Sequence, residues 1–341
     1  MRTLARQLWS LVKPRIVALL ALTGLSALLA AGGGPLPVLL GFLVAGACIA
    51  AGAAAFNCYY DRRLDTRMAR TADRPLPAGR LSPRVAVGFA LGLLALGTAV
   101  GVRTLPLRSV AYMWLGAVSY AGVYTVGLKR RHWLGVVVGG SAGAFPVLAG
   151  WTVVAPVSAP ALLLAALVFV WTPAHAWALA HVYREEFVAA GVPTLPVVAS
   201  APRVRRAVWV SAVLTALVAA SAAPVAGRPY AVACLAGVPA FLWAYRGFYR
   251  GGTAPDAVRA FFSSNLLLAV LFPAWALGGV VGTPRSGLLL AVGALVVAAF
   301  VGLWLGRPAL GDVRSRPLTV RRPLVYLDSL RTAGGEAGET R

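Results

Sequence analysis

The chain has 341 residues, of which 59% are hydrophobic and 12% are charged, and its mean hydropathy is +0.78. These values exclude an ordinary soluble enzyme, whose surface needs more charge. A net charge of +22 would favour nucleic acid as the partner of a soluble protein, but the basic residues here lie between apolar runs. We therefore expect a lipid bilayer as partner and no nucleic acid.

A membrane-spanning helix needs about 20 apolar residues, and ten runs in this chain approach that length. They predict an all-α fold, a polytopic membrane helical bundle. We expect the first run to be a retained span, because no small-residue cleavage site follows it. The runs are 16–32, 36–57, 84–102, 107–127, 134–155, 158–181, 207–226, 229–245, 261–282 and 286–306.

If the ten runs alternate across the bilayer, the charged residues gather on one side. Only four basic residues fall on the other side: Arg103, Arg108, Arg228 and Arg285. All the remaining basic residues and all ten acidic residues lie on the opposite side from these four. The positive-inside rule makes that charged side cytoplasmic. We expect a multi-pass protein of the cell inner (plasma) membrane, with both termini in the cytoplasm.

The composition changes near the end of the chain. The tail at 307–341 contains seven Arg, four acidic residues and several Pro and Gly, with little periodicity. We predict three parts: an intramembrane core at 1–282, an additional transmembrane helix at 283–306, and an Arg-rich cytoplasmic tail at 307–341 that is disordered or lies on the membrane surface.

Polar residues at helical spacing follow the second run. Asn57, Asp61 and Asp65 are four residues apart, so a helix would place them on one face. Two carboxylates and one amide form an all-oxygen set that suits Mg²⁺, which also takes waters and substrate phosphates as ligands. The alternative is that these acids only neutralise nearby basic residues of a solvated loop: Arg62, Arg63 and Arg67.

Basic residues follow this acidic motif and are expected on the same side. Arg70 and Arg74 would supply guanidinium groups that match the oxygens of a diphosphate, while the carboxylates hold Mg²⁺. Lys129 and Arg130, after the fourth run, fall on that side too. A basic triplet after a span can instead serve only to fix topology.

A second acidic site follows the sixth run. Glu185 and Glu186, with Tyr183 and Arg184 before them, fall on the cytoplasmic side, where they could supply a further Mg²⁺ or diphosphate ligand. The alternative is an exposed charged cluster. His175 lies inside the apolar run and shares a face with Trp171. The pair could line an acceptor pocket, or the His could simply bond to a neighbouring helix.

With these motifs together, the chain resembles the UbiA superfamily of intramembrane prenyltransferases from about residue 8 to 282. The acidic motif is typical of the superfamily, and the segments around His175 and 191–198 are similar to its haem-farnesylating branch. The matching segments are Leu11–Arg15, Asn57–Asp65, Arg70–Pro75, Tyr124–Arg131, Gly139–Pro146, Trp171–Ala180 and Gly191–Val198.

The resemblance implies nine spans around a central cavity that opens to the cytoplasm, with Mg²⁺ as cofactor. It implies transfer of a farnesyl group from farnesyl diphosphate to a vinyl group of haem b, and a haem-copper oxidase assembly factor or haem A synthase as possible partner. The chain departs from the family pattern at Glu186, where Asp is usual.

The residue roles that follow from the motifs and the resemblance are these. The expected catalytic residues are Asp61, Asp65 and His175. The expected metal ligands are Asn57, Asp61, Asp65 and Glu186. The expected substrate contacts are Asn57, Arg70, Arg74, Lys129, Arg130, Trp171, Tyr183, Arg184 and Glu186.

Three other functions stay open on the sequence. One is a prenyltransferase with a quinone precursor or other aromatic acceptor, against which the His175 segment argues. The second is a transporter or channel, which would bury charge near midspan, whereas the acids here cluster at one interface. The third is a non-catalytic assembly factor for a terminal oxidase.

Overall fold

The apolar runs fold as helices because a chain inside a bilayer must satisfy its backbone hydrogen bonds within itself. The computed structural model describes residues 3–280, and no strand occurs among them, so the all-α prediction is confirmed for this part of the chain. The tenth run at 286–306 and the tail at 307–341 lie outside the described residues. Both remain predictions.

Six helices in the described part are long and apolar enough to cross a membrane. Their positions agree with the predicted runs, although most extend further at one end. They are α3 (Leu36–Asp65), α5 (Pro83–Thr104), α9 (Ala159–Val182), α12 (Ala201–Ala226), α13 (Arg228–Gly251) and α14 (Ala254–Val280).

The other three predicted spans are interrupted. Helix α1 (Leu4–Leu11) meets α2 (Pro14–Ala30) at a 50° bend, and the two form a seventh span if they are taken as one. Helix α6 (Leu107–Val118) continues as the π-helix η1 (Ser119–Leu128), and a break at residue 140 separates α7 (Gly135–Gly139) from α8 (Ser141–Trp151). Nine spans therefore remain a prediction.

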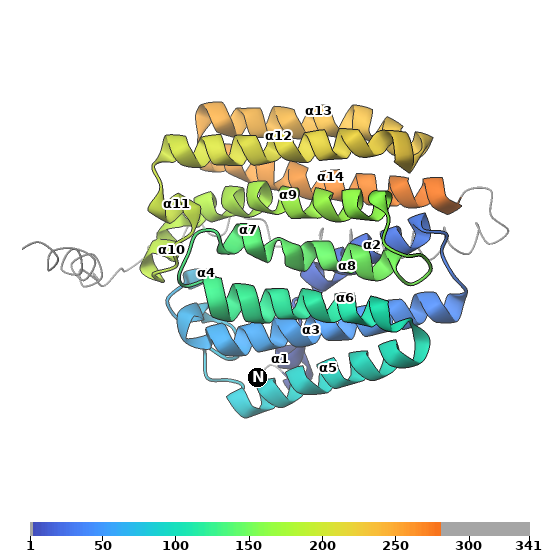
Figure 1. Cartoon of the computed structure of the whole chain (residues 1–341). Coiled ribbons are helices and arrows are strands. Elements are labelled where there is room, and N and C mark those ends of the chain that lie inside the picture. The colour runs from blue at the N-terminus through green and yellow to red at the C-terminus, as the bar shows by residue number, and fades with distance from the viewer. Residues whose placement is uncertain (1–2, 281–341) are drawn as a thin grey trace, which may run out of the picture. The chain divides into compact units, whose positions relative to one another are not determined.

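Small residues let the central helices pack closely. A Cβ atom on Gly150 of α8 would lie 1.9 Å from the backbone oxygen of Gly24 on α2, and one on Gly97 of α5 would lie 2.8 Å from that of Ala45 on α3. Glycine at such contacts is common where membrane helices touch. In Figure 1, α12 and α13 lie on one side of the bundle, α3 and α5 on the other, and α2, α8 and α9 between them.

The outer surface of the bundle is apolar. Leu91 on α5, Leu217 on α12 and Leu235 on α13 are 61%, 60% and 78% exposed. Large exposed apolar side chains on several long helices fit contact with lipid and not with water. The chain is a multi-pass membrane protein.

One end of the bundle carries the short helices of the connections. These are α4 (Ala69–Ala72), α10 (Arg184–Ala189) and α11 (Leu195–Val198), which lie near the end of α3 in Figure 1. The acidic motif and the basic residues that follow it are therefore gathered at the end predicted to be cytoplasmic.

Candidate functional site

Helix α3 runs eight residues past the predicted run and carries the acidic motif on its last turns. No Gly or Pro interrupts the stretch, so the helix continues. Asn57, Asp61 and Asp65 are only 4%, 2% and 4% exposed. The predicted common face exists, and it is buried, so the acids do not form a solvated loop.

Asp61 is held by two cations from the turn that follows η1. Lys129 donates a hydrogen bond to Oδ2, and Arg130 donates to Oδ1 at 3.1 Å. Burial lowers the pKa of the Lys129 ammonium, and the Asp61 carboxylate opposes that shift. Lys129 and Arg130 thus lie where the sequence predicted, beside the first acidic motif.

Asp65 is held by the loop that follows its own helix. The guanidinium of Arg74 donates to its carboxylate at 3.0 Å, and the Thr71 hydroxyl donates to the Asp65 backbone oxygen at 3.0 Å. The chain thus turns back after α3 and places a basic side chain on the acid nine residues before it. This ion pair joins the two predicted groups directly.

Asn57 connects this cluster to the first span. Its amide nitrogen donates to Asp61 at 2.9 Å and to the Thr125 hydroxyl at 3.0 Å, and its amide oxygen accepts a hydrogen bond from Lys13. Lys13 also donates to the Tyr120 hydroxyl at 2.9 Å. Sequence reasoning gave no role to Lys13 or Thr125, although a Lys directly before an apolar run was a usable signal for the first.

The cluster has more positive than negative charge. Four basic side chains contact the polar face that contains the two carboxylates: Lys13, Arg74, Lys129 and Arg130. An excess of cations at a partly enclosed site favours an anionic ligand such as a diphosphate. Carboxylates on the same face fit Mg²⁺, which takes one or two of them and completes its shell with water and phosphate oxygens.

Glu186 lies at the edge of the cluster. Its carboxylate accepts a long hydrogen bond, 3.4 Å, from the backbone nitrogen of Arg70, whose guanidinium lies 5.2 Å from the ring centre of Tyr183. No group of three or more His, Cys, Asp or Glu side chains within residues 3–280 is arranged to hold a metal. The role of Glu186 as a metal ligand therefore remains a prediction.

Arg184 bonds to the segment that follows its own short helix. Its Nε donates to the backbone oxygen of Pro196 at 2.8 Å, which ties the start of α10 to α11. This contact gives Arg184 a structural role in the loop, and its predicted substrate contact stays a prediction.

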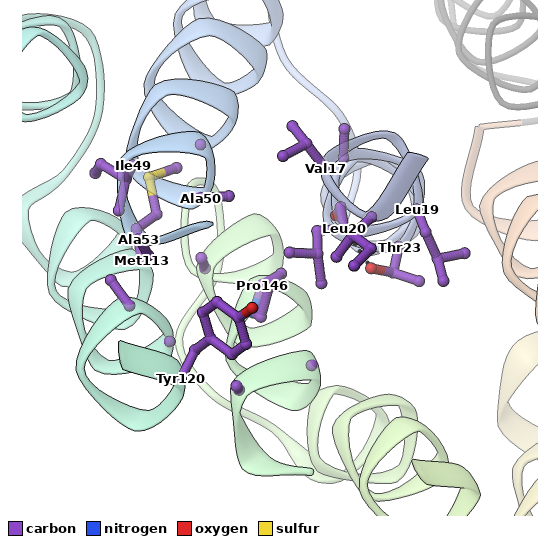
Figure 2. Close-up of a pocket in the computed structure, with 18 of the residues that line it drawn as sticks. Val17, Leu19, Leu20, Thr23, Ile49, Ala50, Ala53, Met113, Tyr120 and Pro146 are labelled. Atoms are coloured by element: carbon purple, nitrogen blue, oxygen red, sulfur yellow. Dashed lines mark hydrogen bonds between the residues drawn. The ribbon is translucent and has the colours of Figure 1, made fainter. Parts of the chain in front are cut away.

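An apolar cavity of about 300 Å³ begins beside the cluster. Figure 2 shows the ring of Tyr120 beside Pro146, with labelled side chains of α3, such as Ile49, on one side of the view and those of α2, such as Leu20, on the other. Lys13 lines the cavity and also contacts Asn57, so it stands between the apolar space and the carboxylates. The volume is at the lower end of the range for small-molecule sites, about 300–1,000 Å³.

Trp171 and His175 form part of the cavity wall, as expected of neighbours on one helix face. The His175 ring stacks between Trp171 and Phe261, with ring centres 4.1 and 4.4 Å apart. Its Nδ1 bonds to the Ser264 hydroxyl at 2.8 Å, and the Trp171 ring nitrogen donates to the Ser264 backbone oxygen at 2.9 Å. Helix α14 thus fixes both predicted residues in place.

Comparisons with known proteins agree with this arrangement. A sequence model described as the UbiA prenyltransferase family matches residues 17–267. A protoheme IX farnesyltransferase of Mycobacterium sp. (strain KMS) is 39% identical over 291 residues, which cover 83% of this chain and 93% of that protein. Another of that name, from Thermus thermophilus, is 41% identical over 278 residues, 80% of this chain and 45% of that protein.

Solved structures share the fold. A UbiA homolog from Archaeoglobus fulgidus bound to DMAPP and Mg²⁺ has a TM-score of 0.62 at 17% identity, over 86% of this chain and 99% of that chain. A UbiA homolog from Aeropyrum pernix K1 has a TM-score of 0.59 at 19% identity, over 84% and 98%. With a family match over more than half of its length and relatives of this similarity, the chain belongs to the UbiA prenyltransferase family.

Proposed function

We propose that this protein transfers a farnesyl group from farnesyl diphosphate to a vinyl group of haem b, giving haem O and releasing diphosphate. The relatives named protoheme IX farnesyltransferase, about 40% identical over most of the chain, support this reaction and its acceptor. The observation that carries the proposal is the buried acidic face of α3, contacted by cations and connected through Lys13 to an apolar cavity.

A prenyl diphosphate fits this pairing because it is itself an apolar chain with an anionic end. The diphosphate would lie against Lys129, Arg130 and Arg74, and the prenyl chain would enter the cavity beyond Lys13. The bond to be broken would then lie at the boundary between the two regions. A transporter would carry charge near the middle of its spans, whereas Asp61 and Asp65 lie on the last turns of α3.

Asp61 and Asp65 would hold Mg²⁺, with Asn57 and Glu186 as further expected ligands. Bound there, the metal would neutralise charge on the diphosphate and make it a better leaving group. The UbiA homolog solved with DMAPP and Mg²⁺ supports a metal-dependent reaction of this type.

The side chains of this protein then assist the cleavage of the carbon–oxygen bond. Lys129 and Arg130 lie where they can stabilise the charge that develops on the leaving diphosphate. The apolar walls keep water from the allylic cation until the acceptor reaches it. The Tyr120 ring, which lines the cavity, can stabilise that cation through its face by about 0.5–2 kcal/mol.

The acceptor would approach the cavity wall formed by Trp171 and His175. Both side chains line the cavity, where Trp171 supplies apolar ring surface and His175 supplies a polar group. When the terminal vinyl carbon attacks the prenyl cation, a carbon–carbon bond forms and the positive charge moves to the other vinyl carbon. Water adds to that carbon and releases a proton, which gives the hydroxyethylfarnesyl substituent. The relatives named protoheme IX farnesyltransferase favour haem over a small phenolic acceptor.

The proposal is tested with membranes that contain the protein. They are incubated with farnesyl diphosphate, Mg²⁺ and either haem b or 4-hydroxybenzoate, and the products are identified by mass spectrometry. We expect farnesylated haem only, and loss of product with EDTA. Prenylated hydroxybenzoate would identify the alternative acceptor class, and the absence of both products with folded protein would support a non-catalytic role.

The remaining assignments rest on the sequence and the family. We propose that 1–282 is the catalytic core, that 283–306 adds a span, and that the tail at 307–341 is cytoplasmic together with the amino terminus. The membrane would be the inner (plasma) membrane of the cell. A haem-copper oxidase assembly factor or haem A synthase would receive the product.

A further inference from the structure

Lys13 has an unusual backbone for its residue type. It joins α1 to α2 at the 50° bend and has φ of +50°, the only positive φ of a non-glycine residue in the described part of the chain. Side chains other than glycine adopt this left-handed conformation at a cost, and such positions cluster at functional sites. In this conformation the Lys13 side chain donates hydrogen bonds to Asn57 on α3 and to Tyr120 on η1.

The partners of Lys13 fix the orientation of the Asn57 amide. An ammonium can only donate hydrogen bonds, so the Asn57 atom facing Lys13 is the oxygen. A carboxylate can only accept, so the atom facing Asp61 at 2.9 Å is the nitrogen. The Thr125 hydroxyl donates to the Tyr120 backbone oxygen at 2.8 Å, which leaves its own oxygen to accept from the same Asn57 nitrogen.

We propose that Lys13 is a positioning residue of the candidate site. It holds the Asn57 amide with the NH₂ group toward Asp61, so that Asn57 orients the Asp61 carboxylate instead of giving its own oxygen to a metal. This inference rests on the proposed metal-dependent function. It differs from the role expected for Asn57, which the resemblance made a direct ligand.

The charge arrangement supports this division of roles. Asp61 already receives hydrogen bonds from Lys129 and Arg130, so its orientation is set by several donors at once. A ligating carboxylate that is itself hydrogen-bonded is a common feature of protein metal sites, and losing such a partner typically weakens metal binding by about 10–100-fold. Lys13 would affect the Asp61 carboxylate indirectly, by holding the Asn57 amide that bonds to it.

The test measures Mn²⁺ binding to the purified full-length protein, with inorganic pyrophosphate present, from the electron paramagnetic resonance signal of free Mn²⁺. The variants are Lys13→Met, Lys13→Arg and Asn57→Asp. Arg84→Met, which removes a charge from an exposed residue at the start of α5, is the matched control. Thermal unfolding of each variant reports whether it is folded.

We expect Lys13→Met to weaken Mn²⁺ binding by about tenfold, Lys13→Arg to restore most of it, and Arg84→Met to leave it unchanged. Asn57→Asp decides between the two roles. As a positioning residue, Asn57 loses its NH₂ donor and gains repulsion with Asp61, so Mn²⁺ binds more weakly. Were it a direct ligand, the new carboxylate would bind Mn²⁺ at least as tightly as the amide.

Equal or tighter binding by Asn57→Asp, or unchanged binding by folded Lys13→Met, would overturn the inference. If Lys13→Met does not fold, Lys13→Arg and Asn57→Asp still decide. Haem farnesylation by the wild-type protein is measured separately. Wild-type protein that shows this Mn²⁺ pattern but makes no farnesylated haem would refute the proposed function and leave the role of Lys13 standing.

Discussion

Arg74 and Asp65 form an ion pair of 3.0 Å across the turn that ends α3, with the Asp65 side chain 6% exposed and that of Arg74 33% exposed. The pair closes the loop after α3 and also places a cation beside the acidic face. It therefore serves the local fold and the candidate site at once.

Replacing Arg74 with Met is expected to destabilise the protein, because it leaves the Asp65 carboxylate buried without its charge partner. Breaking a fully buried pair costs about 3–5 kcal/mol, and the partial exposure of Arg74 reduces this to about 1–3 kcal/mol. Unfolding in detergent measures the effect. The matched control is Arg80→Met, which removes the partner of Asp73 in a pair whose acid is 81% exposed. If Arg80→Met lowered the free energy of unfolding as much as Arg74→Met, the argument from burial would be contradicted.

Asp61→Asn should abolish most turnover while the protein remains folded. The change removes the charge that faces Lys129 and Arg130 and a predicted metal ligand together. We expect the rate of haem farnesylation to fall at least about 100-fold. Asp73→Asn, an exposed acid outside the cluster, should keep near wild-type activity. If Asp61→Asn and Asp65→Asn both stay active, the acidic face is not the metal site.

His175→Phe should affect the acceptor and not the diphosphate. Phe keeps a ring between Trp171 and Phe261 but cannot bond to Ser264. Without the hydrogen bond to Ser264 the ring is held less firmly in the cavity wall, so we expect KM for haem b to rise by up to about tenfold, with KM for farnesyl diphosphate unchanged. His132→Phe, at an exposed position, is the control. A rise in KM for farnesyl diphosphate alone would contradict this prediction, because it would show that His175 acts on the diphosphate substrate and not on the acceptor.

Gly150→Ala should separate α2 from α8 beside the cavity. The new Cβ would lie 1.9 Å from the Gly24 backbone oxygen, and backbone cannot move aside as a side-chain end can. Overpacking of this kind costs about 1–3 kcal/mol or more. Gly92→Ala, where a Cβ meets nothing within 4 Å, should be neutral or stabilising by up to about 1 kcal/mol. Comparison of the two melting temperatures checks the claim, and equal values would refute it.

The amino-acid sequence determined the main elements of this protein. Apolar runs such as 84–102 and 158–181 became α5 and α9 almost unchanged, because helix formation in a bilayer follows from local backbone hydrogen bonding. The face shared by Asn57, Asp61 and Asp65 also followed from helical spacing alone. That the helix extends through this face, and that basic residues lie at the same end, could be predicted from charge and periodicity.

The tertiary structure decided what those residues contact. The break between α7 and α8 lies at Gly140, and the bend at Lys13 directly precedes Pro14, so breaking residues mark both places in the sequence. What the side chains at these places contact could not be predicted from any periodic pattern. Lys13 and Asn57 are 44 residues apart, and their hydrogen bond exists only because α2 and α3 pack with these ends together. Which cation reaches which carboxylate is likewise set by packing, since the contacts of a side chain depend on where the helices lie and not on its position in the sequence.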